Sequence, residues 1–308
     1  MKTRTDVVVV GEILVELVSA EPWTVGTPMT LGFSGDALNA AAASAAAGAR
    51  TAVLTRIADD ELGDLIEERL EQLGIDVSLV RRVPGQQAAY FVHADPTGAR
   101  EFVYLRRGSA GSTLGPEDVA DAGLEEIGLV LTTGVTGALS ATTRAAVLEV
   151  ARRAPRFLYD PNFRPRLTSA ADAAELLRAV APAATAVTPA CPGETMPLLG
   201  TDDPRTAGEI LRGLGARAAV VTRGPSGVLV VDDAGERGLP AVPAPALVDQ
   251  TGAGDSLAGT VAARLALGDT LEEAVRLGTA AASLVLGGHG GTGVVPTLAQ
   301  ARAHLGAS

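Results

Sequence analysis

The chain has 308 residues, a formal net charge of −11 and one cysteine. Its length fits one large α/β domain, and its acidic charge argues against nucleic acid or an anionic membrane as a partner. Cys191 is the single cysteine, which excludes an internal disulfide, and no apolar segment is as long as a membrane span, so we expect a cytoplasmic protein.

The sequence lacks the motifs of several enzyme classes, which limits the reactions that it could catalyse. Lys2 is the only lysine, which excludes a Walker-type phosphate loop and Schiff-base catalysis. The sequence has no His-Glu-x-x-His metal motif, no Cys-x-x-Cys pair and no Gly-x-Ser-x-Gly elbow. The first apolar strand, over 7–10, is not followed by the Gly-x-Gly-x-x-Gly fingerprint, which disfavours a dinucleotide-dependent dehydrogenase.

In the first half of the chain, strands alternate with helices until two strands interrupt them. The predicted elements are strands over 7–10 and 51–57, an alanine-rich helix ending near Gly48, a helix over 59–73, and strands over 87–94 and 100–106 joined by a turn at 95–98. Two antiparallel strands inside an α/β run indicate a separate small sheet. We therefore predict a β-sheet lid built from about residues 12–34 and 86–108.

The second half returns to the alternation. The predicted strands are 129–133, 156–160, 184–188 and 218–222, followed by an antiparallel edge at 227–232 and 238–242 and a short strand end at 244–248. The predicted helices are one that ends near 153, one over 257–267, one over 271–286 and one after Pro296. This order predicts a three-layer α/β fold with a mostly parallel central sheet, in one domain over 1–308.

A glycine-rich turn at residues 249–256 (Asp-Gln-Thr-Gly-Ala-Gly-Asp-Ser) opens onto a helix. Backbone N–H groups at a helix start have no partner inside the helix and form an anion site. Gly252 and Gly254 lack the Cβ atoms that would keep a phosphate away. Asp255 would repel that anion, so it makes chemical sense as a general base for a hydroxyl that attacks phosphorus. The structural alternative is that Thr251 caps the helix and Asp255 favours its dipole.

The residues from Thr251 to Asp255 resemble the catalytic signature of the ribokinase-like sugar kinases, the PfkB family. The resemblance covers nearly the whole chain in order. It implies catalytic roles for Gly252, Ala253, Gly254 and Asp255, a sugar substrate, ATP and Mg²⁺. It also implies a lid over the sugar that pairs two subunits into a homodimer.

The sugar side of this resemblance begins at residues 33–39, which are similar to the family's first signature, a glycine pair followed by Asn at a helix start. Here Ser34 replaces the first glycine. The resemblance implies that Gly35, Asp36 and Asn39 hold sugar hydroxyls. The structural alternative is a helix capped by Asp36.

Tyr90, Tyr104 and Arg106 resemble residues of one branch of the family, the 2-keto-3-deoxygluconate kinases, in which similar residues line the sugar site. Residues 160–164 (Asp-Pro-Asn-Phe-Arg) resemble the family's Asp-x-Asn-x-Arg segment at the carboxyl end of a strand, where open α/β sheets bind ligands. Arg106 and Arg164 indicate a sugar with a carboxylate, because arginine binds carboxylates bidentately. The structural alternative is tyrosines that pack on the lid and arginines in ordinary salt links.

On the nucleotide side, the resemblance implies that the binding residues are Thr222, Gly224, Gly227, Thr251, Gly252, Gly254 and His289. The family's Asn-x-x-Glu segment, which organises magnesium and phosphate through water, reads Cys-Pro-Gly-Glu at 191–194. Glu194 can fill the carboxylate role through water, whereas Cys191 is not a hard oxygen ligand.

Two alternatives stay open. One is a kinase for a neutral sugar such as fructose or ribose. In such kinases a short carboxylate near the start of the chain binds sugar hydroxyls, and this chain has Glu12 and Glu16 in that region. The other is a catalytically silent sugar-binding protein on the same fold, which the change at Cys191 motivates. The phosphoryl donor is also open, because ADP-using relatives share related folds.

Overall fold

The computed structural model describes residues 5–19, 21–93 and 102–307. Its central sheet has nine strands in the order β13-β12-β11-β10-β9-β8-β1-β4-β5. These are β1 (Val7–Val10), β4 (Thr51–Ala58), β5 (Val80–Val83), β8 (Leu129–Thr133), β9 (Phe157–Asp160), β10 (Ala186–Val187), β11 (Ala218–Thr222), β12 (Val228–Asp232) and β13 (Gly235–Leu239). Neighbours from β11 to β5 are parallel, and β12 and β13 add an antiparallel edge.

The central strand β1 shows why the sheet has helices on both faces. Its four valines are fully buried, because a parallel strand covered on both sides reads as a continuous apolar run. Val7 and Val9 pack into one core cluster, and Val8 and Val10 into the other, as strand alternation requires. The fold is therefore the predicted three-layer α/β arrangement.

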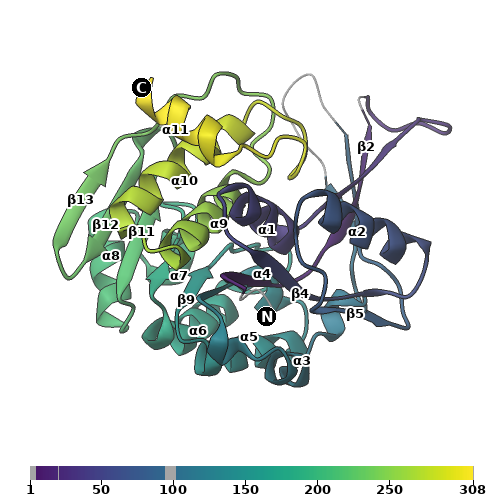
Figure 1. Cartoon of the computed structure of the whole chain (residues 1–308), viewed down its shortest axis with the longest axis horizontal. Coiled ribbons are helices and arrows are strands. Elements are labelled where there is room, and N and C mark those ends of the chain that lie inside the picture. Colours follow the sequence, from purple (N-terminus) through teal and green to yellow (C-terminus); the bar gives the residue numbers. More distant parts are fainter. Residues whose placement is uncertain (1–4, 20, 94–101, 308) are drawn as a thin grey trace.

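The two helical layers divide as Figure 1 shows. One layer holds α1 (Asp36–Ala46), α2 (Glu61–Gln72), α9 (Ala253–Ala266) and α10 (Leu271–Val285), with α11 (Leu298–Gly306) packed on α10. The other holds α3 (Pro116–Asp121), α4 (Gly134–Ala138), α5 (Ala141–Arg153), α6 (Ala170–Val180), α7 (Thr195–Leu199) and α8 (Pro204–Gly213). Small residues let α1 and α9 approach closely, since a Cβ at Gly259 would lie 2.1 Å from the carbonyl oxygen of Ala40. Among the helices of the described ranges, none has the length and apolar character needed to cross a membrane.

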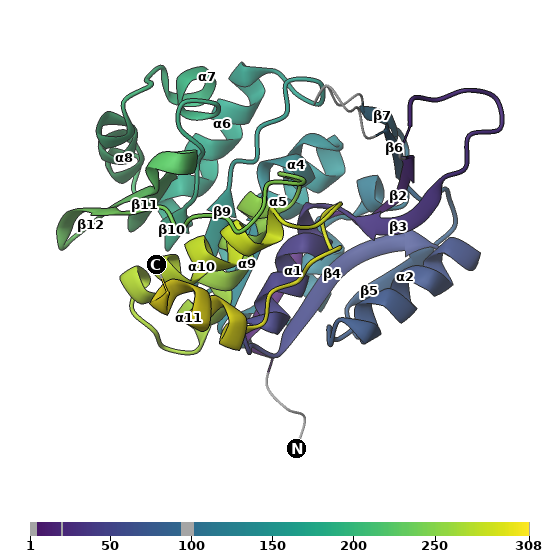
Figure 2. The same ribbon diagram turned by 90° about the horizontal axis from the view of Figure 1, so that it is seen from above.

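A second sheet forms the predicted lid, with strand order β3-β2-β6-β7. Its strands are β2 (Leu14–Ser19), β3 (Thr30–Ser34), β6 (Ala89–His93) and β7 (Phe102–Leu105). Figure 2 shows them gathered at one end of the molecule, beyond α1 and β4. The antiparallel pairing of β6 with β7 confirms the hairpin, although its predicted turn lies outside the described residues.

The structure corrects several predicted boundaries. Helix α9 begins at Ala253, four residues before the expected start, so Asp255 lies in its first turn. No strand forms over 244–248, β13 lies at Gly235–Leu239 rather than 238–242, and strand β5 was not predicted. The start of α9 was predicted too late because Gly254 lies in its first turn and glycine is a poor helix former. Strand β5 was not predicted because two arginines interrupt its apolar pattern.

Candidate active site

A cavity of about 1830 Å³ lies between the carboxyl ends of the central strands and the lid. Parallel strands bring their carboxyl ends to one edge of a sheet, which is where open α/β sheets bind ligands. The predicted residues that line this cavity are Gly35, Asp36, Asn39, Tyr90, Tyr104, Arg106, Arg164, Glu194, Thr222, Thr251, Gly252, Gly254, Asp255 and His289. Most of the predicted site is therefore brought together.

Three predicted residues do not line the cavity: Gly224, Gly227 and Ala253. Gly227 serves backbone packing, because its φ is 83° and a Cβ there would lie 2.1 Å from the carbonyl oxygen of Leu239. Gly224 is exposed beside the cavity, and Ala253 is the first residue of α9.

Asp255 stands at the helix start with both oxygens bound. Asn39 Nδ2 donates to Asp255 Oδ2 over 2.8 Å, and Asn162 Nδ2 donates to Oδ1 over 3.0 Å. Desolvation raises the pKa of Asp255 to about 6; the charge of Asp36 adds to the rise, while Asn39, Arg164 and Asn162 oppose it. A carboxylate with a pKa near 6 is ionised at neutral pH and is a better proton acceptor than an exposed aspartate.

The turn before Asp255 is fixed against the glycine-rich loop at 287–293. Asp249 Oδ1 accepts the N–H of Thr251 over 2.7 Å, and its Oδ2 accepts the N–H of Gly290 over 2.9 Å. Gly252 has a φ of 82°, and a Cβ there would lie 3.0 Å from the carbonyl oxygen of Gly291. At Gly254 a Cβ would meet no atom within 4 Å. The first turn of α9 therefore opens directly into the cavity.

Asp36 is a second buried carboxylate in the cavity wall. The hydroxyl groups of Thr133 and Thr136 donate to its Oδ2, whereas Oδ1 has no hydrogen-bond partner within the described residues. Burial raises the pKa of Asp36, and the hydroxyl of Thr133 opposes that rise. An unpartnered buried acceptor next to a cavity is suited to a ligand hydroxyl.

Arg106 takes part in a buried ion pair. Its Nε and Nη2 donate to Oε2 of Glu12 over 3.1 and 2.5 Å. The hydroxyl of Ser109 donates to Oε1 of Glu12 over 2.7 Å. Glu12 is fully buried and Arg106 is 13% exposed. Burial raises the pKa of Glu12, and Arg106 opposes it. The salt link anticipated as the structural alternative is therefore present at Arg106.

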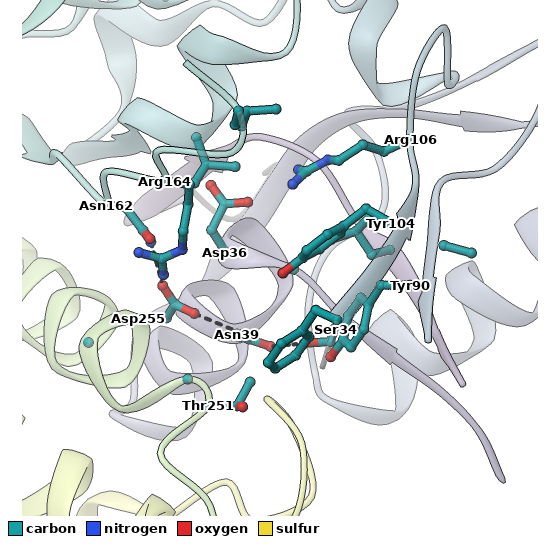
Figure 3. Close-up of a pocket in the computed structure, with 18 of the residues that line it drawn as sticks. Ser34, Asp36, Asn39, Tyr90, Tyr104, Arg106, Asn162, Arg164, Thr251 and Asp255 are labelled. Carbon is teal, nitrogen blue, oxygen red and sulfur yellow. Dashed lines mark hydrogen bonds between the residues drawn. The ribbon is translucent and has the colours of Figure 1, made fainter. Parts of the chain in front are cut away.

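Arg164 is different, because it forms no ion pair within the described residues and donates only to the carbonyl oxygen of Phe163. Its charge nonetheless lowers the pKa values of Asp36, Asp160 and Asp255. In the view of Figure 3, Arg164 and Arg106 enter the cavity from opposite sides, with Asp36 between them. Arg164 therefore retains guanidinium donors for a ligand, as does Arg166, which also lines the cavity and, in the part of the chain described, donates only to the carbonyl oxygen of Phe102.

The lid presents two tyrosines side by side, with ring centroids 5.7 Å apart (Figure 3). Tyr90 is buried and donates its hydroxyl to Oε1 of Glu16, and burial followed by the charge of Glu16 raises the Tyr90 pKa. Tyr104 is 41% exposed and lies under the guanidinium of Arg106 at 5.5 Å. The lid thus offers apolar ring faces with polar tips.

Glu194 lies beside Asp160 at the strand ends. Its Oε1 accepts the N–H of Phe163 over 2.6 Å, and its Oε2 accepts the N–H of Ala190 over 2.8 Å. Burial raises the pKa values of Glu194 and Asp160. Within the described residues, no three or more His, Cys, Asp or Glu side chains are grouped to hold a metal. Cys191 does not line the cavity, and its Sγ contacts the carbonyl oxygen of Asp202 at 3.1 Å.

Sequence reasoning missed several features of this site. They are Thr188, Leu247 and Val248, the roles of Asn162 and Asp249 inside segments that the sequence had singled out, and the pairing of Glu12 with Arg106. Asn162 lay inside the 160–164 segment that was singled out, and its position two residues after a strand-ending Asp was the available signal. Leu247 and Val248 are 69% and 41% exposed, and the sequence had placed them in a strand end at 244–248 that does not form.

Comparison with known proteins gives consistent matches. The model of the pfkB family carbohydrate kinases matches residues 4–298. The 2-dehydro-3-deoxygluconokinase of Thermoproteus tenax is 35% identical over 274 residues, which cover 87% of this chain and 83% of that protein. The 2-dehydro-3-deoxygluconokinase of Escherichia coli K12 is 28% identical over 299 residues, 91% of this chain and 94% of that protein.

Solved structures show the same architecture. A PfkB protein from Polaromonas sp. JS666 superposes with a TM-score of 0.85 at 27% identity, over 97% of this chain and 99% of that one. A putative ribokinase II from E. coli in complex with ATP and Mg²⁺ gives a TM-score of 0.88 at 21% identity, over 99% of this chain and all of that one (100%). At that identity, the second match supports the fold alone.

Proposed function

The chain belongs to the pfkB family of carbohydrate kinases, and we propose that it transfers the γ-phosphoryl group of ATP to a hydroxyl of 2-keto-3-deoxygluconate. The observation that carries the chemistry is Asp255, a carboxylate with a pKa near 6 at the start of a helix that opens into the cavity. The acid substrate, also called 2-dehydro-3-deoxygluconate, is suggested by the relatives and by the guanidinium of Arg164, which forms no ion pair within the described residues.

The geometry suits in-line phosphoryl transfer. The sugar hydroxyl gives its proton to Asp255 while its oxygen attacks the γ-phosphorus, the bond from that phosphorus to the bridging oxygen breaks, and ADP leaves. The backbone N–H groups of Gly252 and Gly254, at the N-terminus of α9, stabilise the charge on the transferring group, whereas that of Ala253 donates to the carbonyl oxygen of Gln250 over 3.4 Å. On the sugar side, Gly35, Asp36 and Asn39 hold hydroxyls, while Tyr90 and Tyr104 pack on the carbon chain.

For the nucleotide, we propose a site formed by Thr222, Gly224, Gly227, Thr251, Gly252, Gly254 and His289. The exposed apolar side chains of Leu247 and Val248 line the same cavity and suit the face of a base. Gly224 and Gly227 act here only by shaping the turn after β11, since neither lines the cavity.

Magnesium fits this site through its water shell. The ion keeps several waters and needs few protein ligands, and the oxygens of Glu194 retain lone pairs beyond those used by two backbone N–H groups. When bound, the ion neutralises charge on the phosphates. We expect turnover to stop in excess chelator and to return with added Mg²⁺; full activity in chelator would refute this role.

The neutral-sugar alternative is weakened by the two early carboxylates. Glu12 is bound by Arg106 and Ser109, and Glu16 by Tyr90, so neither is free to take sugar hydroxyls. The silent-protein alternative is weakened because Cys191 lies outside the cavity wall. Both observations favour an active sugar-acid kinase.

We also propose that residues 1–308 act as one cytoplasmic kinase domain that forms a homodimer through the lid, with no nucleic-acid or membrane partner. The lid face opposite the tyrosines carries Leu31, Val103 and Leu105, which are 47%, 42% and 59% exposed. Exposed apolar side chains on a sheet with open edges need cover.

The deciding experiment is coupled measurement of ADP release with a panel of acceptors. The panel holds 2-keto-3-deoxygluconate, its C4 epimer 2-keto-3-deoxygalactonate, gluconate, fructose and ribose. We expect the highest kcat/KM with 2-keto-3-deoxygluconate. A higher value with fructose or ribose would replace the acid substrate by a neutral one, and no ADP release with any acceptor would refute the kinase.

A further inference from the structure

The general base is held by a pair of asparagine amides from different elements. Asn39 comes from α1, and Asn162 from the segment after β9, and each donates to a different oxygen of Asp255. We propose that Asn162 is a positioning residue that fixes the Asp255 carboxylate and keeps it ionised; this rests on the proposed function, in which Asp255 is the base. Together the two amides form a clamp, defined here as Asn39 and Asn162.

The backbone at Asn162 has an uncommon conformation. Its φ is 40°, and among the described residues it is the single non-glycine residue with a positive φ. Asparagine tolerates this region better than most side chains, but the conformation still costs energy. Such strain persists only where the surroundings over-determine it, and it is typical of functional sites.

Two contacts determine that conformation. Asp160 Oδ1 accepts the N–H of Asn162 over 3.1 Å, which closes an Asx turn at the end of β9. Gly134 admits the segment, because a Cβ there would lie 2.1 Å from the carbonyl oxygen of Pro161. The Asn162 amide therefore reaches Asp255 from a hydrogen-bonded turn that packs closely against Gly134.

The orientation of the Asn162 amide follows from charge. The ionised Asp255 accepts hydrogen bonds only, so the Nδ2 end must face it. The Oδ1 end is left buried, with no partner among the described residues. The amide of Asn39 is set in a similar way, since Ser34 Oγ donates to its Oδ1 over 3.4 Å (Figure 3).

An amide suits this place better than a cation. The charged groups that face Asp255 are Asp36 on α1, Asp160 on β9 and Arg164 after β9. The charge of Asp36 raises the pKa of Asp255 and that of Arg164 lowers it, while Asp255 in turn raises the pKa of Asp160. A neutral donor stabilises the carboxylate without the strong pairing that would lower its basicity. The clamp thus offsets desolvation only in part, and a pKa near 6 results.

The test is a titration of the Asp255 carboxyl carbon by NMR in ¹³C-aspartate-labelled protein without substrate, with the signal assigned by its loss in Asp255→Asn. Asn162→Asp keeps the size and the tolerance of positive φ but replaces the donor by a second acid. Asn162→Gly keeps the backbone and removes the amide. We expect the midpoint to rise by about one pH unit or more in Asn162→Asp, which is tenfold in proton affinity, and by less in Asn162→Gly.

Kinetics then separate positioning from folding. In both variants we expect plateau kcat to fall by roughly 10–100-fold, because small misplacements of a reacting group are costly, with KM for the sugar changed little and the melting temperature retained in Asn162→Gly. Unchanged midpoints in both variants would overturn the proposal, as would losses of kcat that only follow losses of melting temperature. A shifted midpoint in a chain that phosphorylates no sugar would support the clamp and refute the proposed function instead.

Discussion

Asp255 is the residue on which the chemistry depends, and its pKa sets a pH profile. A base must be ionised, so we expect kcat/KM, which reports the free enzyme, to rise with pH through about 6 and then to level off. Asp255→Asn keeps the shape and removes the base, and positioned bases contribute roughly 10²–10⁴-fold. We expect kcat to fall by that factor with sugar binding largely kept. Near-normal turnover in the variant, or a flat profile between pH 5 and 8, would contradict the assignment.

Arg164 and Arg106, two of the arginines that line the cavity, lead to different expectations. Arg164 is exposed and unpaired among the described residues, so Arg164→Gln should leave folding intact. A charge-assisted hydrogen bond contributes about 1.5–3 kcal/mol, so the acid substrate should bind roughly 10–150-fold more weakly while a neutral sugar is unaffected. Isothermal titration with both ligands measures this, and Arg178→Gln on α6 is the matched control away from the cavity. Equal losses for both ligands would count against a carboxylate contact.

We expect removal of Arg106 to lower the stability of the folded protein. Arg106→Gln would leave Glu12 buried without its cation, and breaking a buried pair in this way costs about 3–5 kcal/mol. We expect a clear drop in the urea unfolding midpoint for this variant. In Glu12→Gln with Arg106→Gln, both charges are gone and much of that loss should be recovered. An Arg106→Gln protein as stable as wild type would show that the ion pair between Arg106 and Glu12 does not stabilise the fold.

Residue-level prediction from the sequence succeeded where a motif is local. The string from Thr251 to Asp255 brings its donors and its carboxylate together within one turn of chain. The partner of Arg106 was beyond reach, because Glu12 lies 94 residues away and only the fold of the lid brings them together. The role of Asn162 was hidden for a similar reason, since a φ of 40° is a property of the folded turn.

At the scale of elements, the lid offers the clearest variant. Leu17 stands opposite Leu31 and Phe91, and Phe91 opposite Val103, so these apolar side chains share one face of the small sheet. If two lids pair through this face, Leu31→Glu should give a monomer by light scattering at micromolar concentration. Leu148→Glu, on α5 and 40% exposed, is the control. A wild-type monomer would refute the lid dimer outright.

Element prediction was most secure for the buried parallel strands, whose runs of Val and Leu are required by cover on both faces. It was weaker at the sheet margin. Strand β5 reads Val-Arg-Arg-Val, and its two arginines fit an edge position that no periodicity signals. The short β10 was predicted over 184–188 but pairs only at Ala186–Val187, because boundaries depend on neighbouring strands more than on local preference.

The whole molecule concentrates buried carboxylates around one cavity. Burial raises the pKa values of Glu12, Asp36, Asp160, Glu194 and Asp255. The carboxylates whose pKa values are lowered, such as Glu149, Asp203 and Asp232, belong to ion pairs and helix caps at or near the surface. Stability and activity are therefore opposed here, because the acids that suit phosphoryl transfer are costly to bury in ionised form.

This opposition predicts an unusual dependence of stability on pH. A buried acid with a raised pKa holds its proton in the folded state after the unfolded chain has lost it, so the free energy of unfolding falls as pH rises from about 4 to the folded pKa. For Asp255 that window ends near 6. The surface acids with lowered pKa values act in the opposite direction, but only as the pH falls below about 4. We therefore expect a higher urea midpoint at pH 5.5 than at pH 7.5. In Asp255→Asn one titrating group is gone, so the difference between the two pH values should shrink. A midpoint that rises from pH 5.5 to 7.5 in the wild type would contradict the raised pKa values around the cavity.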